Sequence, residues 1–501
     1  MIDSYIHSTL NFFAALFIVA VGLFLLTIIA LYIIDIRQTR HTIRRNYPVI
    51  GRFRYFFEHL GEFFRQYFFA LDREELPFNR ATRSWVYRAA KNVNTSVAFG
   101  STRSLTQAGD IHFTNAGFAL LEEHTLETTA RVIGPLCQYP YTAPSFINIS
   151  GMSFGALSSP AITALSHGAA KAGCWLNTGE GGLSPYHLAG NCDIVYQIGT
   201  AKYGVRDEEG NLCPAKLKSL AEKPQVRMFE LKLSQGAKPG KGGILPATKV
   251  SGEIAAIRGI PEGQASISPN RHRDIENIQE LIDRLDDIRD ITGKPVGFKT
   301  VLGSTQWFTE LCAYMAKLPS EQVPDFITLD GAEGGTGAAP QSLMDHMGLP
   351  LMESLPFVVD ELKRFGLRER VAVIAGGKLV TPSTAARAMA TGADFVVSAR
   401  GFMFSLGCIQ AMQCHQNTCP TGITTHNERL QKGLDPQNKA NRVANYHHEL
   451  VKEVEMIAHS CGAAHARKLT RQHVRIINEA GRSTLLSDVY PEPIKHVSDT
   501  H

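Results

Sequence analysis

Eight short apolar runs between residues 144 and 400 constrain the fold of this chain more than any other feature. Their bounds are 144–153, 174–179, 192–199, 228–233, 296–302, 326–331, 371–377 and 395–400. Each run is continuously apolar rather than alternating, which is typical of parallel strands that are buried on both faces. Helix-like stretches separate the runs. Eight strand–helix units in this order predict an α/β chain folded as a (β/α)8 TIM barrel.

A doubly wound sheet is the alternative α/β arrangement for such a pattern. That arrangement usually binds a nucleotide through a glycine-rich turn that follows its first strand. The sequence has no G-x-G-x-x-G after a first strand and no G-x-x-x-x-G-K-[ST]. Several runs end in glycine or a polar residue, so we expect the chemically active residues at the C-terminal mouth of a barrel.

The N-terminal region contains an uncharged apolar stretch at 12–34. A helix of this length spans about 34 Å, which is enough to cross a bilayer. A signal peptide and a buried core helix are alternatives, but the stretch is long and lacks a basic segment before it. Arg37, Arg40, Arg44 and Arg45 follow it. This asymmetry predicts a single-pass protein of the inner (cytoplasmic) membrane with its catalytic part in the cytoplasm.

A second helix with one aromatic face is expected just after this stretch. Its apolar residues recur at helical spacing. They are Phe53, Phe56, Phe57, Leu60, Phe63, Phe64, Tyr67 and Phe68. This face can rest on a membrane surface or pack on the catalytic domain, and the sequence does not choose between the two.

We expect four parts in the chain of 501 residues. They are a transmembrane anchor at 1–36, a linker with the aromatic helix at 37–100, a catalytic barrel domain at 101–430 and a helical extension at 431–501. Within the extension, an apolar stripe predicts a helix over 436–461. The net charge of +4 is too small to indicate a nucleic-acid partner.

Three cysteines near the C-terminal end form a compact motif. Cys408, Cys414 and Cys419 have the spacing C-x5-C-x4-C, and a proline follows directly. A proline after the last cysteine recurs in iron–sulfur ligand runs, so this motif favours an iron–sulfur cluster. A zinc site completed by His415 or His426 and a chance grouping of buried thiols are the alternatives.

Glycine-rich loops follow three of the predicted strands, at 330–340, 375–378 and 399–401. Phosphate sites in barrels form from the loops after the last two strands, although ordinary tight turns use the same residues. Lys299 lies inside a predicted buried strand, where a lysine is costly unless it is paired, functional or extended to the barrel mouth.

The loop at 177–182 and the long segment 234–270 carry residues suited to an anionic ligand. The second is rich in Gly, Pro and Lys, and long loops in compact domains are usually functional. Its Lys238 and Lys241, together with Lys232 in the preceding strand, suit a dicarboxylate. Loop charges are often merely solvated, so this indication is weak by itself.

Five ordered motifs resemble the FMN-binding synthase domain of glutamate synthase. They are MSFGALS (152–158), NTGEGG (177–182), QGAKPGKGG (235–243), DGAEGGTGAAP (330–340) and C-x5-C-x4-C-P. The resemblance covers about residues 140–430. It is strongest to the stand-alone, membrane-anchored members of the FMN-binding glutamate synthase family.

The resemblance implies a barrel that holds FMN beside a [3Fe-4S] cluster. The implied flavin positions are Ser153, Gly155, Ala156, Lys299, Gly334, Gly335, Thr336, Gly376, Gly377, Ala399 and Arg400. The implied cluster ligands are Cys408, Cys414 and Cys419. The implied positions that engage 2-oxoglutarate are Glu180, Lys238 and Arg258. Lys299 would stabilise the reduced flavin ring.

The implied reaction is hydride transfer from reduced FMN to 2-iminoglutarate, formed from 2-oxoglutarate and ammonia, to give L-glutamate. Electrons would enter through the cluster. No glutaminase or pyridine-nucleotide domain is recognisable, so the implied donor is external, such as ferredoxin or a separate reductase. Ile244 stands where the family's enzymes carry a glutamine. A different amino or imino acid substrate, or an electron carrier or redox sensor without turnover, are the alternatives.

Overall fold

The computed structural model describes residues 2–493. The chain divides into two units, with the boundary between Ala81 and Thr82. Each unit is described separately below. The finer division into four parts at 36, 100 and 430 stays a prediction.

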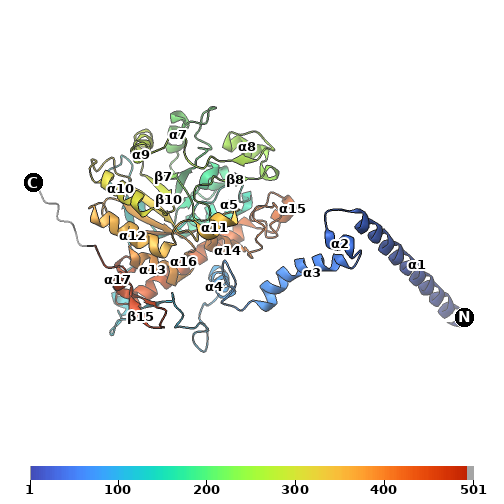
Figure 1. Ribbon diagram of the computed structural model, residues 1–501. Coiled ribbons are helices and arrows are strands. Elements are labelled where there is room, and N and C mark those ends of the chain that lie inside the picture. The colour runs from blue at the N-terminus through green and yellow to red at the C-terminus, as the bar shows by residue number, and fades with distance from the viewer. Residues whose placement is uncertain (1, 494–501) are drawn as a thin grey trace, which may run out of the picture. The chain divides into compact units, whose positions relative to one another are not determined.

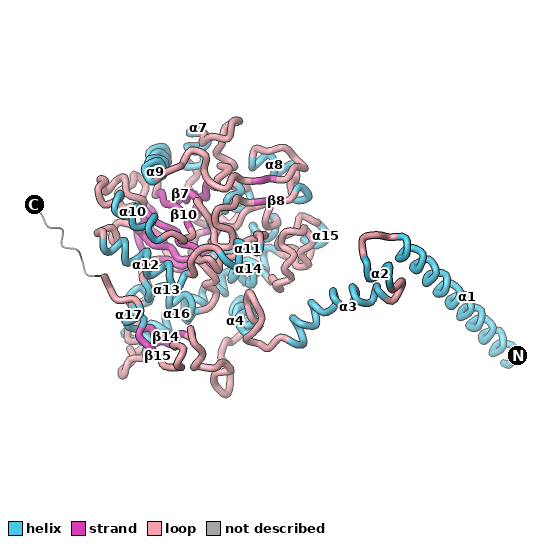
Figure 2. Tube along the Cα trace, in the orientation of Figure 1, coloured by secondary structure: helices cyan, strands magenta, loops and turns pink. Residues whose placement is uncertain are grey.

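Eight parallel strands close into a barrel in the second unit, in chain order around the ring. The strands are β4 (Ile147–Ile149), β5 (Leu176–Asn177), β6 (Ile194–Ile198), β7 (Val226–Lys232), β10 (Val296–Thr300), β11 (Phe326–Asp330), β12 (Ala372–Gly376) and β13 (Phe395–Ser398). Figure 2 shows these strands at the centre, with helices outside them. All eight lie within or overlap the predicted runs, and the predicted TIM barrel is confirmed.

Helices and short additional elements connect the strands (Figure 1). The helices of this unit are α4 (Arg80–Ala90), which crosses the division, α5 (Ser159–Ala172), α6 (Pro185–Leu188), α7 (Pro214–Ala221), α8 (Gly252–Arg258), α9 (Ile278–Thr292), α10 (Thr305–Met315), α11 (Gln341–His346), α12 (Leu351–Arg364), α13 (Pro382–Thr391), α14 (Arg400–Leu406), α15 (Glu428–Gln431), α16 (Pro436–Ser460) and α17 (Leu486–Val489). Local sequence explains several of their ends. For α9, the side chain of Asn277 caps the first turn, and Gly293 ends the helix with φ of 67°.

Apolar side chains fill the barrel interior, together with a hairpin formed by β2 (Arg131–Ile133) and β3 (Tyr141–Ala143). Ile133 and Tyr141 of the hairpin share one buried cluster with Trp175, Phe326 and Phe395. This packed core leaves the opposite, C-terminal ends of the strands for polar residues.

The C-terminal segment completes the outer layer. The predicted helix at 436–461 is confirmed as α16, and it packs against α5. The segment is not only helical, because β14 (Val474–Ile477) pairs with β15 (Ser483–Leu485) and with β1 (Ile111–Phe113). The long segment 234–270 also has structure of its own, a hairpin of β8 (Ile244–Leu245) and β9 (Ser266–Ile267) around α8.

The N-terminal unit is helical. It contains α1 (Ile2–Arg37), α2 (Thr42–Asn46), α3 (Gly51–Phe64) and a short π-helix, η1 (Arg65–Phe69). Residues Tyr5–Arg37 of α1 are long and apolar enough to cross a membrane, by length and composition alone. The predicted aromatic helix is α3 continued by η1.

Candidate functional site

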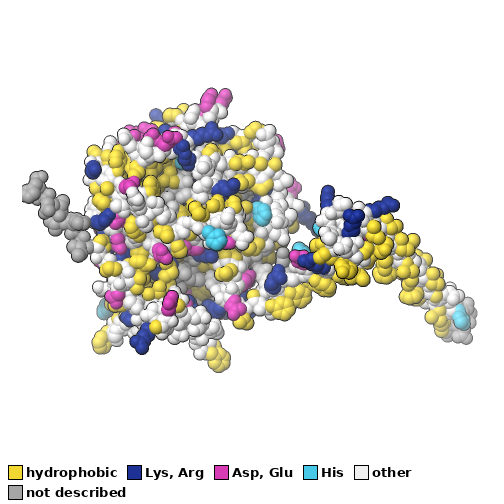
Figure 3. Space-filling view, viewed as in Figure 1, with side chains coloured by type: hydrophobic (Ala, Val, Ile, Leu, Met, Phe, Trp, Pro, Cys, Tyr) yellow, Lys and Arg dark blue, Asp and Glu magenta, His cyan; other side chains and the backbone are white. Residues whose placement is uncertain are grey.

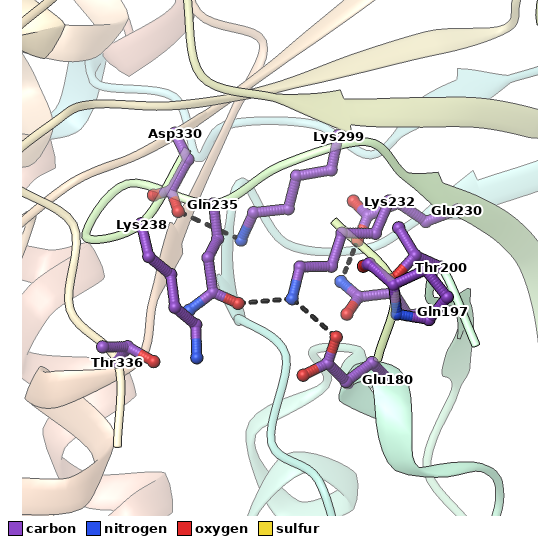
Figure 4. Close-up of polar contacts among 12 residues, drawn as sticks. Glu180, Gln197, Thr200, Glu230, Lys232, Gln235, Lys238, Lys299, Asp330 and Thr336 are labelled. Atoms are coloured by element: carbon purple, nitrogen blue, oxygen red, sulfur yellow. Dashed lines mark hydrogen bonds and ion pairs between the residues drawn. The ribbon is translucent and has the colours of Figure 1, made fainter. Parts of the chain in front are cut away.

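Lys299 is a buried cation at the centre of the barrel mouth. The register of β10 places it beside Lys232 of β7 and Thr328 of β11. Its Nζ lies 3.4 Å from Oδ2 of Asp330 (Figure 4). Burial by itself lowers the pKa of Lys299, but the carboxylates of Asp330 and Glu230 outweigh burial and raise it. Lys299 is therefore held charged.

Glu230 of β7 is a second buried charge beside it, and its carboxylate is fully bonded. Asn177 Nδ2 and Gln197 Nε2 donate to Oε1 at 2.9 and 2.7 Å, and Thr328 Oγ1 donates to Oε2 at 2.5 Å. Glu230, Lys299 and Thr328 also line a small enclosed cavity inside the barrel. These bonds offset the cost of burying the carboxylate.

A group of opposite charges lies nearer the opening. Lys232 Nζ donates to Oε2 of Glu180 at 2.9 Å and also to Oε1 of Gln235 (Figure 4). Burial alone raises the pKa of Glu180, but Lys232, Lys238 and Arg258 outweigh burial and lower it. Glu180 is thus ionised and already paired with a lysine.

Lys238 is a buried cation of this group whose side chain has a single hydrogen-bond partner in the described structure. Its Nζ donates to the carbonyl oxygen of Ala338 at 3.1 Å. Burial lowers its pKa, and the neighbouring Lys232 and Lys241 lower it further against the attraction of Glu180. An anion placed here would relieve this excess of positive charge.

Arg258 lies close to the turn after β4 but is bound within the protein. Its guanidinium donates to Ser266 Oγ at 3.1 Å and to the carbonyl oxygen of Phe154 at 3.3 Å. It also lies over the ring of Tyr203, 5.2 Å from the centroid. Burial lowers its pKa, and Glu180 opposes this effect. Arg258 therefore helps to hold the long segment 234–270 in place.

Glycine turns stand at the ends of β4 and β12, the two strands that flank β13. Ser153, Gly155 and Ala156 follow β4, and Gly155 has φ of 100°. Gly376 ends β12, and Gly377 follows with φ of 136°. Such backbone angles favour glycine, and a Cβ at Gly377 would lie 3.2 Å from the backbone nitrogen of Gly331.

The other expected flavin residues lie on the adjoining ends. Gly334, Gly335 and Thr336 follow β11, and Ala399 precedes α14. Arg400 Nη2 donates to the carbonyl oxygen of Thr336 at 2.6 Å and so ties the loop after β11 to the start of α14.

These positions form one continuous arc, because β10, β11, β12, β13 and β4 are successive neighbours in the barrel. Closely packed glycine backbone, with a buried cation at one end of the arc, fits a flat ligand that carries a phosphate. The residues present therefore fit the expected FMN.

The three cysteines of the C-terminal motif lie in one loop after α14. Cys408 and Cys419 are buried, and Cys414 Sγ lies 3.8 Å from Nη1 of Arg400. Burial raises the pKa of Cys408 to about 11. Burial also acts to raise the pKa of Cys419, but hydrogen bonds, the largest from Thr421, outweigh it and lower the pKa.

Within residues 2–493, no three His, Cys, Asp or Glu side chains converge closely enough to hold a metal ion. The structure thus brings the three cysteines into one loop but does not place their sulfur atoms in ligand geometry. The donor set, three thiols beside an arginine, is still suited to a thiolate-bound cluster. The zinc alternatives gain no support, since His426 Nε2 bonds the carbonyl of Gly155 at 2.8 Å and His415 is exposed.

A buried lysine connects this loop to the turn after β4. Lys249 Nζ donates to the carbonyl oxygens of Thr424, Cys414 and Ala156 at 2.6, 2.7 and 3.4 Å. Burial lowers its pKa to about 8. Lys249 thereby joins the cysteine loop, the expected flavin turn and the long segment in which it lies.

Comparison with known proteins shows the family to which this chain belongs. A family model described as "Conserved region in glutamate synthase" matches residues 107–464. This chain belongs to that family. The glutamate synthase large subunit-like protein YerD of Bacillus subtilis (strain 168) is 40% identical, over 93% of this chain and 97% of that protein.

A more distant relative within the glutamate synthase family is named archaeal glutamate synthase [NADPH], from Methanocaldococcus jannaschii. It is 36% identical over 60% of this chain, and the match spans 55% of that protein. Among solved structures, mandelate oxidase with (S)-2-phenylpropionate is 13% identical, with a TM-score of 0.44 over 80% of this chain and 98% of that one. That likeness is too distant to bear on activity.

Several polar residues of this glutamate synthase family member were not predicted as site residues. They are Asn177, Gln197, Glu230, Gln235, Lys249 and Asp330. A signal was present for Glu230, because it and Lys232 occupy alternate positions of a strand whose other buried residues are apolar, and so share one face. No local pattern marked Lys249, whose partners lie about a hundred or more residues away in sequence.

Proposed function

We propose that this protein is an FMN-dependent oxidoreductase of the glutamate synthase type. In the proposed reaction, 2-oxoglutarate and ammonia condense to 2-iminoglutarate with loss of water. A hydride and a proton then reduce the imine to L-glutamate. The ammonia is free or derived from glutamine elsewhere. The observation that carries the proposal is the buried Lys299–Asp330 pair at one end of a continuous arc of glycine turns.

The residues of the arc have distinct parts in this proposal. Gly334, Gly335 and Thr336 would line one side of the flavin site, and Ser153, Gly155 and Ala156 the other. Gly376, Gly377, Ala399 and Arg400 would surround its phosphate. FMN, when bound, would supply the hydride. Lys299 would place positive charge beside the ring, and its raised pKa keeps that charge present at neutral pH.

The charged group at the opening would orient the substrate. Lys238 has one carbonyl partner in the described structure and a pKa lowered by its cationic neighbours, which suits it to bind a carboxylate. Glu180 is ionised and paired with Lys232, so it would position that lysine rather than act alone. Arg258 would act through the long loop that it holds.

We further propose that Cys408, Cys414 and Cys419 hold a [3Fe-4S] cluster through which electrons enter. The donor would be external, such as ferredoxin or a separate reductase. Helix α1 would anchor the protein as a single-pass span in the cytoplasmic membrane, with the barrel in the cytoplasm. The arginines that follow α1 support this orientation.

A direct assay tests the proposal. Full-length protein would be purified without oxygen in detergent or nanodiscs, loaded with FMN, and analysed for flavin, iron and sulfide. With 2-oxoglutarate, ammonium and a reduced low-potential donor, we expect glutamate to form in step with donor oxidation. A flavin-loaded protein that forms no glutamate would contradict the proposed substrate.

One observation favours a second substrate. Ile244 of β8 is about half exposed, where a glutamine is expected for 2-oxoglutarate. An apolar side chain there would suit a different imino acid. Reoxidation of reduced flavin by another 2-oxo acid with ammonium, but not by 2-oxoglutarate, would favour this alternative. Flavin that no substrate reoxidises would indicate an electron carrier or redox sensor.

A further inference from the structure

Helix α3 and η1 present one strongly aromatic face that none of the described residues of the N-terminal unit covers. Its exposed rings are Phe53, Phe56, Phe57, Phe63, Phe64, Tyr67, Phe68 and Phe69. Phe57 is 61% exposed and Phe68 74% exposed. On the opposite side of the helix lie Arg54 and Glu58. Figure 3 shows the hydrophobic side chains of this region gathered along one edge.

An ion pair with a buried carboxylate fixes the direction in which α3 leaves α1. Arg52 at the start of α3 donates through Nε and Nη2 to both oxygens of Asp35, at 2.8 and 2.7 Å. The backbone nitrogen of Val49 donates to the same carboxylate at 3.0 Å. The Asp35 side chain is only 1% exposed. A bidentate pair of this kind is directional, so it specifies an angle as well as a contact.

Close backbone packing tightens the same elbow, which we define as residues 35–52. A Cβ at Gly51 would lie 2.8 Å from the carbonyl oxygen of Ile43, so α2 and α3 approach as only glycine allows. Arg44 lies over the ring of Tyr55, 4.6 Å from its centroid. Figure 1 shows α3 leaving this elbow in a different direction from α1.

Exposed arginines lie within the elbow, just after the apolar stretch of α1. Arg37, Arg40 and Arg45 are exposed, and none of them belongs to the Asp35 pair. Cationic side chains at the end of an apolar span are attracted to anionic lipid headgroups, and aromatic rings favour the boundary between headgroups and acyl chains.

We propose that α3 and η1 lie in the membrane interface, with the aromatic face inserted at the acyl boundary of a bilayer that contains anionic lipid. The inference rests on α1 spanning that bilayer, and it is independent of the reaction that the barrel catalyses. Two observations select a lipid surface over a protein partner. The aromatic face continues directly from the apolar span through a fixed elbow, and arginines sit where the headgroups would lie.

In this arrangement the protein has two membrane contacts of different kinds. The span anchors the chain, and the interfacial helix restricts how the segment after Phe69 can leave the surface. An amphipathic helix with aromatic residues on one side and charges on the other is the form expected for this position.

Site-specific photo-crosslinking in the full-length protein tests the proposal. The photoreactive residue p-benzoylphenylalanine would replace Phe57 in one variant and Glu58, on the opposite face, in a matched control. Both would be placed in nanodiscs of phosphatidylcholine with phosphatidylglycerol, irradiated, and analysed by mass spectrometry. We expect lipid adducts at Phe57 to exceed those at Glu58 at least tenfold.

Each other result would overturn the proposal. Adducts from Phe57 to residues 82–501 would show that the face packs on the barrel unit, and adducts to a second copy would show a dimer interface. Equal lipid adducts at both positions, or none at either, would exclude an oriented interfacial helix. Repeating the experiment at Phe64 guards against a local defect at one site. Hydrogen exchange of the unmodified protein in nanodiscs should also show protected amides over 53–68.

Discussion

At the scale of single residues, three buried ionised groups at the barrel mouth have charged or hydrogen-bonding partners. Lys299 faces Asp330, Glu230 accepts three hydrogen bonds, and Lys232 pairs with Glu180. Buried charges are tolerated only with such partners. Loss of one partner should therefore lower the folding stability more than loss of both. Comparing the two variants distinguishes an electrostatic contribution to folding from a contribution to catalysis.

Replacing Lys299 tests this distinction. Lys299→Met leaves Asp330 as a buried carboxylate without its counter-charge, which typically costs about 3–5 kcal/mol of folding free energy. The double variant K299M/D330N removes both members of the pair and should recover much of that stability. Its rate of substrate reduction should stay roughly 100-fold or more below wild type, because the charge beside the ring is absent.

Urea unfolding and anaerobic turnover measure the two effects. Lys317→Met, at an exposed position, is the control and should change neither. A double variant with wild-type turnover would contradict the part given to Lys299.

Lys249 offers a second test at this scale. Lys249→Met removes three hydrogen bonds that hold the cysteine loop to the turn after β4. Loss of a residue that positions metal ligands typically lowers metal affinity about 10–100-fold. We expect less iron and sulfide per chain and faster loss of iron to a chelator, with FMN content retained. Lys249→Arg should restore part of the iron. If K249M retains as much iron as the wild type, Lys249 does not position the cysteine loop.

At the scale of elements, the two units depend on different interactions. In the barrel, neighbouring strands align their C-terminal ends, so turns far apart in sequence meet in one arc. In the N-terminal unit, a few polar contacts at the elbow orient two helices that share little core. Asp35 accepts bonds from both Arg52 and the backbone of Val49.

The elbow should therefore open when Asp35 is neutralised. Asp35→Asn leaves Arg52 without its counter-charge, and because Arg52 is one-third exposed the cost falls below that of a fully buried pair, at about 1–3 kcal/mol. Hydrogen exchange over 38–55 should rise roughly tenfold in nanodiscs. Asp72→Asn disrupts the exposed Arg80–Asp72 pair and should leave this exchange unchanged. Equal protection in wild type and D35N would show that the ion pair does not hold the elbow.

At the scale of the whole molecule, three buried histidines make the folding stability of the barrel unit depend on pH. Burial lowers the pKa values of His187, His272 and His447 to about 4. Each bonds a backbone carbonyl within the packed structure, as His187 does to Met152 at 2.8 Å. All three are therefore neutral in the folded barrel unit at neutral pH.

Stability should consequently fall as the medium becomes acidic. Below pH 6.5 the unfolded chain takes up protons on these histidines, whereas the folded chain does not until about pH 4. Each histidine can therefore cost up to about 3 kcal/mol of unfolding free energy between these limits. Urea midpoints measured from pH 7 to 4 should show the decline. His187→Gln should flatten it, and His124→Gln, at an exposed site, should not. Wild-type urea midpoints that do not change from pH 7 to 4 would contradict the lowered pKa values of the three histidines.

Patterns that a short stretch of sequence contains were sufficient to predict much of this protein. Continuous apolar runs predicted the strands of the barrel, helical spacing predicted α3 and α16, and cysteine spacing marked the loop after α14. These features depend on the burial of neighbouring residues, which a local pattern records directly.

Only the tertiary structure decided which distant residues meet. Glu230 receives Thr328 from another strand, Lys249 reaches Cys414 in another loop, and Asp35 receives Arg52 across a turn. Such contacts depend on strand register, barrel closure and helix direction, and these are properties of the whole chain rather than of any one segment. For the same reason the spacing of the cysteines could predict a ligand set, while the positions of their sulfur atoms depended on how the surrounding loops pack.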